Sequence, residues 1–220
     1  MTTVALETST RAPSVAVRRP DGEPRERPLG PGAHASGLLP ALEALLCAEG
    51  LAPRSITAVL VGTGPGSYTG LRVGIATAQG LARATGARLV GVPSTEVLAY
   101  GALAPGEEGV VLIDARQGEL YYAQYRRLES EVETVVAPRV VGSAEVQSLL
   151  PAAIPIFARA DAVQAAGLPP DAGGRARDCA VRASSLLELG SARLESRGGM
   201  SLDDVQPLYL RPFRTSVAKR

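Results

Sequence analysis

Histidine and cysteine are almost absent from this chain of 220 residues, and their scarcity limits the chemistry open to it. The only histidine is His34, so no histidine cluster is available to bind a metal ion. Cys47 and Cys179 are too few for a disulfide framework and fit a reducing compartment. A Ser–His–Asp triad would depend on His34 alone, and no G-x-S-x-G motif occurs. The sequence therefore gives little support to catalysis.

The sequence also lacks a long apolar run and a net charge of either sign. No stretch of about 18 apolar residues occurs, and Met1 leads directly into a strand-like segment, so neither a membrane span nor a secretory signal is expected. The formal net charge of +1 speaks against unaided binding to nucleic acid or membrane. Apolar residues make up 45% of the chain, enough for a sizeable core. We expect a folded, soluble, cytoplasmic protein.

Apolar runs in the first half of the chain predict an α/β fold. Residues 4–6 and 14–17 flank a polar turn and predict a β-hairpin. The β-branched runs 57–61 and 88–92 are separated by a stretch with helical spacing at 69–85, which predicts a parallel βαβ unit. Leucines at 38, 39, 42, 45 and 46 predict an amphipathic helix over 36–49, and the Pro- and Gly-rich stretch 20–31 predicts a loop or an irregular third strand.

Proline, glycine and acidic residues gather at 102–109 and predict a domain boundary. We therefore predict a first lobe at 1–102 and a second at 103–220, whose last segment packs back toward the first. No repeat is visible between the two halves. The second half has strand-like runs and helical stretches at 110–113, 120–125, 144–150, 154–158 and 183–197.

The most informative segment is the glycine-rich stretch 62–70, Gly-Thr-Gly-Pro-Gly-Ser-Tyr-Thr-Gly. It follows a strand and opens a helix, so backbone N–H groups and the positive helix end can face an anion. It is not a Walker A loop, because it lacks the Lys-Ser/Thr pair. It is not a dinucleotide fingerprint, because Ser67 replaces the third glycine. A phosphate site and a tight strand-to-helix turn both remain open.

The helix after this loop carries a ridge of small residues. Gly70, Gly74 and Ala78 lie four apart and share one face, and Leu71 and Ile75 flank them. Each glycine in a helix interior costs roughly 1 kcal/mol relative to alanine, so close packing has to compensate. The packing partner is the protein's own sheet or first helix, or a helix of another chain, and both can hold on different faces of this helix.

Five motifs together resemble TsaB (YeaZ) proteins, and they span nearly the whole chain. The most specific is the run Gly-Pro-Gly-Ser-Tyr-Thr-Gly-Leu-Arg at 64–72. The others are Ala-Leu-Glu-Thr-Ser-Thr with Ser-Val-Ala-Val, His-Ala-Ser-Gly-Leu-Leu-Pro, Asp-Ala-Arg-Gln-Gly-Glu-Leu-Tyr and Pro-Leu-Tyr-Leu-Arg, at 5–10 with 14–17, 34–40, 114–121 and 207–211.

The resemblance implies the actin/Hsp70/sugar-kinase-like (ASKHA) fold, with two ribonuclease H-like lobes and a first hairpin that corresponds to a phosphate loop. Family members usually carry aspartate where this chain has Glu7. The extra methylene moves the carboxylate outward by about 1 Å, which argues against a metal–nucleotide held by this lobe alone. No tightly bound cofactor is expected, although ATP or ADP can sit at a partner interface. The candidate phosphate-facing residues are Thr8, Ser9, Thr10, Gly64, Gly66 and Ser67.

The resemblance also implies a role and partners. TsaB-like proteins are non-catalytic subunits that act with TsaD and the small ATPase TsaE to form N6-threonylcarbamoyladenosine (t6A) at position 37 of tRNAs reading ANN codons. They reach tRNA through the complex and have no membrane partner. Their two early helices form a four-helix bundle with TsaD, or with a second copy in a homodimer. The candidate interface residues here are Leu38, Leu42, Gly70, Leu71, Gly74, Ile75 and Ala78.

Two enzymatic alternatives remain. The hydroxyl-rich turn 8–10 and the glycine loop would suit a free-standing ATPase or kinase of the same fold. The older glycoprotease naming of the wider family suggests a metallopeptidase, whose two metal-binding histidines would fall at Ser94 and Leu98. Because leucine cannot bind a metal and one serine is a poor substitute, the metallopeptidase is the less favoured of the two.

Overall fold

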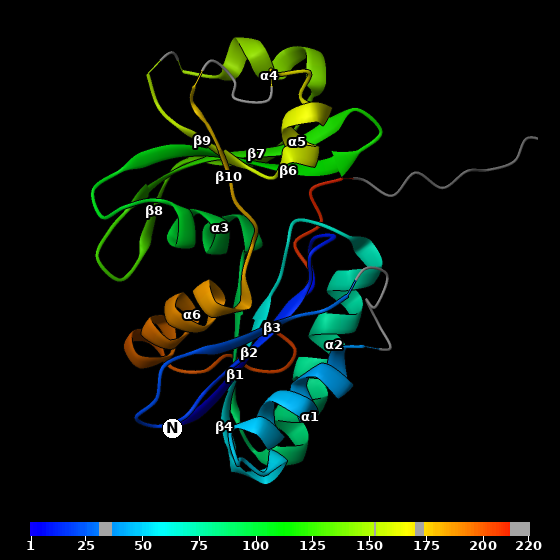
Figure 1. Ribbon diagram of the computed structural model, residues 1–220, viewed down its shortest axis with the longest axis vertical. Helices are drawn as coiled ribbons and strands as arrows, with labels where there is room; N and C mark the ends of the chain where they lie inside the picture. Colours follow the sequence, from blue (N-terminus) through cyan, green and yellow to red (C-terminus); the bar gives the residue numbers. More distant parts are fainter. Residues whose placement is uncertain (31–36, 152, 170–173, 212–220) are drawn as a thin grey trace, which may run out of the picture.

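The computed structural model describes residues 1–30, 37–151, 153–169 and 174–211, which fold into two lobes stacked along the long axis of the molecule (Figure 1). Each lobe is built on one five-stranded sheet. No helix in these four stretches is long and apolar enough to span a membrane.

The first sheet has the strand order β3-β2-β1-β4-β5. Strand β1 pairs antiparallel with β2, which confirms the hairpin, and parallel with β4, which itself pairs parallel with β5. The irregular stretch after β2 forms β3, an edge strand that pairs antiparallel with β2. The strands are β1 (Thr2–Glu7), β2 (Ser14–Arg18), β3 (Arg25–Pro28), β4 (Ile56–Gly62) and β5 (Arg88–Val92).

The second sheet repeats this topology, with the order β8-β7-β6-β9-β10. Its first three strands form an antiparallel meander, while β9 pairs parallel with β6 and β10 parallel with β9. The two sheets therefore share one plan, although no sequence repeat marks it. The strands are β6 (Glu108–Arg116), β7 (Glu119–Arg127), β8 (Val132–Gly142), β9 (Ile156–Ala158) and β10 (Ala176–Asp178).

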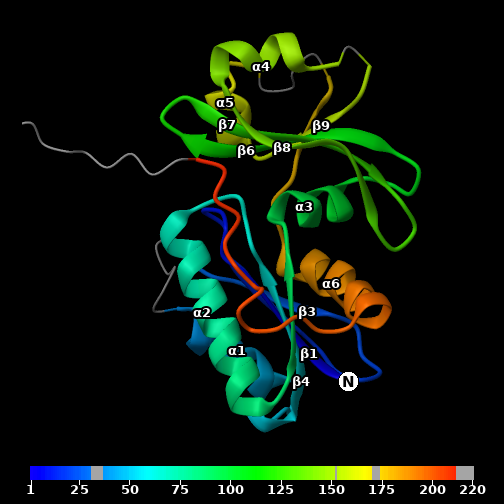
Figure 2. The same cartoon turned by 180° about the vertical axis from the view of Figure 1, so that it is seen from behind.

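The helices complete a layered structure (Figures 1 and 2). Helices α1 and α2 cover the outer face of the first sheet, and α4 and α5 cover the outer face of the second. Helices α3 and α6 lie between the sheets, and residues of both belong to one apolar core that joins the lobes. The helices are α1 (Leu38–Ala48), the 3-10 turn η1 (Pro53–Ser55), α2 (Tyr68–Thr85), α3 (Ser94–Ala102), α4 (Ser143–Leu149), α5 (Ala160–Ala165) and α6 (Ala183–Arg197).

Local sequence explains where α2 begins and ends. The Ser67 hydroxyl accepts a hydrogen bond from the Gly70 N–H, which satisfies one free donor of the first turn. Gly86 ends the helix with φ 72°, a left-handed conformation that costs glycine little. The 18-residue helix therefore starts at the junction of the lobes and runs to the far end of the first lobe.

A charged cluster tightens the layer between the sheets. Arg193 of α6 forms ion pairs with Glu96 of α3 and with Glu131, which precedes β8 in the second lobe. The Arg193 side chain is only 11% exposed, so water screens these pairs weakly. Arg197, on the next turn, also pairs with Glu131, but its side chain is 65% exposed.

We predict that Arg193→Met lowers the free energy of unfolding by about 3 kcal/mol, because it leaves the partly buried Glu96 without a cation and Glu131 with only the exposed Arg197. Arg197→Met removes the same charge from an exposed position and should cost less than about 1 kcal/mol. Urea unfolding of both variants measures the two changes. Equal losses in the free energy of unfolding would contradict a stabilising role for the Arg193 ion pairs.

Candidate functional site

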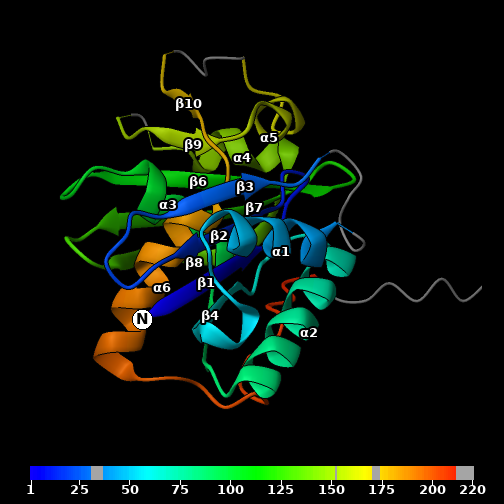
Figure 3. The same cartoon turned by 60° about the horizontal axis from the view of Figure 1, so that its bottom comes forward.

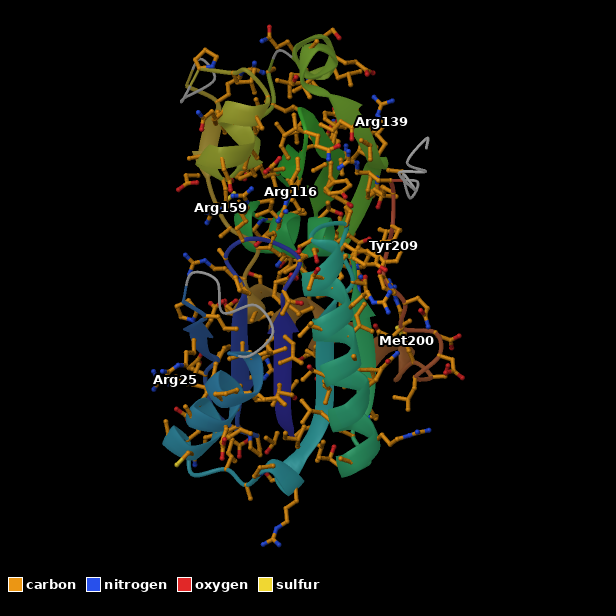
Figure 4. All side chains as sticks on the ribbon, turned by 90° about the vertical axis from the view of Figure 1, so that its right-hand side faces the viewer. Arg25, Arg116, Arg139, Arg159, Met200 and Tyr209 are labelled. Atoms are coloured by element: carbon orange, nitrogen blue, oxygen red, sulfur yellow. The ribbon has the colours of Figure 1, made fainter. Side chains whose placement is uncertain are left out.

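A cavity of about 540 Å³ lies between the lobes. The loop after β1, the glycine loop and the start of α2 line it from the first lobe. The second lobe contributes the end of β6, the turn after it and the segment entering α5, and Tyr209 and Arg211 follow from the C-terminal part of the chain. In Figure 4, Arg116 and Arg159 lie at the lower edge of the upper lobe, and Tyr209 lies beside the start of α2.

Four of the six predicted phosphate-facing residues line this cavity: Ser9, Thr10, Gly66 and Ser67. The other two, Thr8 and Gly64, do not line it.

The contacts of Thr8 and Gly64 explain why neither residue lines the cavity. The Thr8 hydroxyl donates to the Gly70 carbonyl oxygen at 2.8 Å, inside the chain. Gly64 exchanges hydrogen bonds with Ser94, through the Gly64 N–H and the Ser94 hydroxyl and through the Ser94 N–H and the Gly64 carbonyl. Gly64 also has φ 93°, so this glycine serves the turn itself.

The Glu7 side chain is fully buried. One carboxylate oxygen accepts the Ser9 N–H at 2.7 Å, and the other accepts the Ser94 hydroxyl at 3.0 Å. A Cβ on Gly62 would lie 2.0 Å from the second oxygen, so only glycine on the neighbouring strand leaves room for this carboxylate. Glu7 therefore joins the end of β1, the following loop and the start of α3, and it does not line the cavity.

Burial raises the pKa of Glu7 above its ordinary value of 4.5, although Ser9 and Ser94 act in the opposite direction. As the pH rises past 4.5, the unfolded chain loses this proton before the folded chain does. The free energy of unfolding then falls until the folded pKa is passed, by about 1.4 kcal/mol for each unit between the two pKa values.

The variant Glu7→Gln keeps the shape and cannot ionise, so its stability relative to wild type should increase as the pH rises from about 4 to 8. Thermal unfolding followed across this range measures the difference. Glu195→Gln, at an exposed position of α6, is the control and should run parallel to wild type. A Glu7→Gln profile that also runs parallel would contradict an ionisable buried Glu7.

The small-residue ridge of α2 packs inward, against the chain's own loop after β1. A Cβ on Gly70 would lie 2.1 Å from the Thr8 carbonyl oxygen, and one on Gly74 would lie 2.2 Å from the Thr8 hydroxyl oxygen. The glycines therefore allow the helix to approach the loop after β1. The remaining predicted interface residues are all buried within the chain: Leu38, Leu42, Leu71, Ile75 and Ala78.

We predict opposite effects of two Gly→Ala substitutions in α2. Gly74→Ala drives a methyl group against Thr8 and should lower the free energy of unfolding by about 1–3 kcal/mol. Gly80→Ala, where no atom of the described residues lies within 4 Å, should raise it by about 0.5–1 kcal/mol through helix propensity. Chemical denaturation distinguishes the two, and a stabilising Gly74→Ala would refute the inward packing of this ridge.

Sequence reasoning missed the residues at the mouth of the cavity. Arg11 follows the hydroxyl-rich turn, and Arg116 is the last residue of β6, with φ 65°. The rings of Tyr68 and Tyr209 lie 5.3 Å apart between centroids, and the Arg72 guanidinium lies 5.3 Å from the Tyr68 ring. Four of these five residues, all except Arg11, fall inside the family motifs at 64–72, 114–121 and 207–211. These motifs were the signal in the sequence that could have identified them.

The two residues at the predicted histidine positions have other roles. The Ser94 hydroxyl is occupied by Glu7 and by the Gly64 N–H, and Leu98 supplies apolar lining to the cavity. Within the described stretches, no group of three or more His, Cys, Asp and Glu side chains is placed to hold a metal ion. His34 lies outside those stretches. Burial raises the pKa of the Cys179 thiol to about 12, so this cysteine is a poor nucleophile.

Comparison with known proteins agrees with the family resemblance seen in the sequence motifs. The family model described as TsaD, tRNA N6-adenosine threonylcarbamoyltransferase, matches residues 31–179. The "tRNA threonylcarbamoyladenosine biosynthesis protein TsaB" of Escherichia coli K12 is 37% identical over 149 residues, 64% of each chain. The protein of that name from Bacillus subtilis is 32% identical over 143 residues, 62% of this chain and 60% of the relative. The matched region thus spans less than two thirds of these relatives.

Solved structures match over nearly the whole chain. A Pseudomonas aeruginosa protein described as similar to peptidase YEAZ has a TM-score of 0.80 and 30% identity, covering 96% of this chain and 99% of that one. YeaZ from the same organism has a TM-score of 0.79 and 27% identity, covering 95% and 99%.

The doubled sheet topology and the cavity between the lobes define a two-lobed protein of the actin/Hsp70/sugar-kinase-like class. Within that class, the chain belongs to the TsaB/YeaZ family, to which the broader TsaD family model extends.

Proposed function

We propose that this chain is the non-catalytic scaffold subunit for t6A formation at position 37 of tRNAs reading ANN codons, and that it docks and activates TsaD together with TsaE. The observation that carries the proposal is the match to proteins named for t6A biosynthesis in both Escherichia coli and Bacillus subtilis. The family model named for the threonylcarbamoyltransferase supports the same process.

The outer helices provide a suitable docking face. Helices α1 and α2 lie side by side over the first sheet (Figure 3). Their buried sides share one apolar cluster, which leaves the opposite sides exposed. We define the docking face by its exposed residues, which are Leu39, Glu43 and Ala44 of α1 with Arg72, Ala76 and Gly80 of α2.

The composition of this face suits helix–helix packing. Leu39 is 53% exposed, one of the most exposed large apolar side chains in the described residues. Ala76 and Gly80 lie four apart on α2, so their short side chains let a second helix approach closely. The same face would serve a second copy of the chain, so a homodimer and a TsaD complex would compete for it.

We predict that Ala76→Glu weakens the complex with TsaD more than about 10-fold, because it buries an unpaired carboxylate in the interface. Ala144→Glu introduces the same change at an exposed position of α4 in the second lobe and should bind as wild type does. Gel filtration with light scattering, on each protein alone and with TsaD, measures both the homodimer and the complex.

Reconstituted t6A synthesis with TsaD and TsaE completes the test. Ala76→Glu should lose t6A formation in parallel with the complex, while Ala144→Glu retains it. A wild-type chain that forms no complex with TsaD would overturn the proposal, and so would an Ala76→Glu variant that binds normally.

A further inference from the structure

Arginine gathers around the cavity in a protein that is almost neutral overall. The chain carries 23 basic and 22 acidic residues, yet among the described residues the cavity is lined by four arginines and only two aspartates. The positive end of α2 faces the same space, because Tyr68 at its first position is part of the lining. The cavity therefore attracts anions. The arginines are Arg11, Arg116, Arg159 and Arg211.

The arginines differ in how they are engaged. Arg211 pairs with Glu119 at the start of β7 and donates to the Ala115 carbonyl near the end of β6, which attaches the C-terminal segment to this hairpin. Arg159 pairs with Asp161. Arg11 and Arg116 are exposed, and their side chains form no ion pair or hydrogen bond within the described residues. These two are therefore available to bind an external anion.

The inner part of the cavity is apolar, unlike its mouth. Leu98, Leu112, Ile113 and Val181 contribute buried apolar surface. Tyr68 and Tyr209 stand at the mouth, 45% and 38% exposed. A volume of about 540 Å³ lies within the range of small-molecule sites, which is about 300–1,000 Å³. The lining thus suits a flat apolar ring inside and negative charge outside.

We propose that this cavity receives one unstacked base of a single-stranded RNA segment, whose phosphates contact Arg11 and Arg116 and whose bases stack on the Tyr68–Tyr209 pair. Single-stranded RNA is recognised in this way, by aromatic stacking combined with basic groups along the backbone. The choice of RNA among anions rests on the function proposed above.

Two features favour a strand over a free nucleotide. The available arginines and the tyrosine pair are exposed at the mouth, so a ligand that uses them extends out of the cavity. The Glu7 carboxylate is held by Ser9 and Ser94 and does not line the cavity, so it offers no ligand there to a metal–nucleotide. The site also adjoins the docking face, because α2 begins at the mouth and exposes Arg72 and Ala76 along that face. RNA bound here would lie next to a docked partner.

The test is fluorescence anisotropy of the full chain with a labelled single-stranded oligoribonucleotide of ten residues, at several salt concentrations. Wild type should bind, with an affinity that falls as salt rises. Arg11→Gln/Arg116→Gln should weaken binding about 10-fold or more and make the salt dependence shallower. Tyr209→Leu should weaken binding with little change in that dependence.

A matched double variant, Arg19→Gln/Arg83→Gln, removes two exposed arginines that do not line the cavity. It should bind within about two-fold of wild type. The proposal is overturned if the oligoribonucleotide does not bind at low salt, or if the two double variants weaken binding equally. It is also overturned if a duplex of the same length binds as well, or if AMP or ADP binds as tightly as the ten-residue strand.

Gel filtration separates this inference from the proposed function. Arg11→Gln/Arg116→Gln lies off the docking face and should still form the complex with TsaD. If wild type forms the complex and t6A normally but does not bind the oligoribonucleotide, only the RNA site is refuted. If RNA binds as described and no complex forms, only the scaffold role is refuted.

Discussion

The packing of α3 against α6 between the two sheets is the constraint on which the rest of the structure depends. These helices join both sheets in one apolar core, so the lobes cannot separate without exposing it to water. Arg193 adds a charged link among α6, α3 and the second lobe in the same layer. The distance between the lobes, and with it the size of the cavity, follows from this layer.

The glycine motif that identifies the family serves packing as much as it serves any ligand. Gly62 leaves room for the buried Glu7 carboxylate, and Gly70 and Gly74 let α2 approach Thr8. Gly64 provides the left-handed turn between β4 and α2. Only Gly66 and Ser67 of the loop reach the cavity, together with the first residues of α2.

Helix α2 connects the two proposed sites. Its inner side carries the small residues that pack on the first lobe, while its outer side belongs to the docking face. Its first residue, Tyr68, stands at the mouth of the cavity beside Tyr209. A partner docked on this helix would therefore lie close to whatever occupies the cavity, which gives a scaffold a way to position RNA beside an enzyme.

Sequence patterns were sufficient for the local structure of the first lobe. The hairpin, the βαβ unit and the leucine-striped helix each have a hydrophobic period that one segment displays by itself. The family motifs added the doubled fold, which no visible repeat revealed. The direction of the α2 ridge, the burial of Glu7 and the meeting of Arg11, Arg116 and Tyr209 were decided by tertiary structure alone. Each depends on which distant segments come into contact. A helix packs closely only against a surface of matching shape, and a buried carboxylate needs hydrogen-bond donors from other segments.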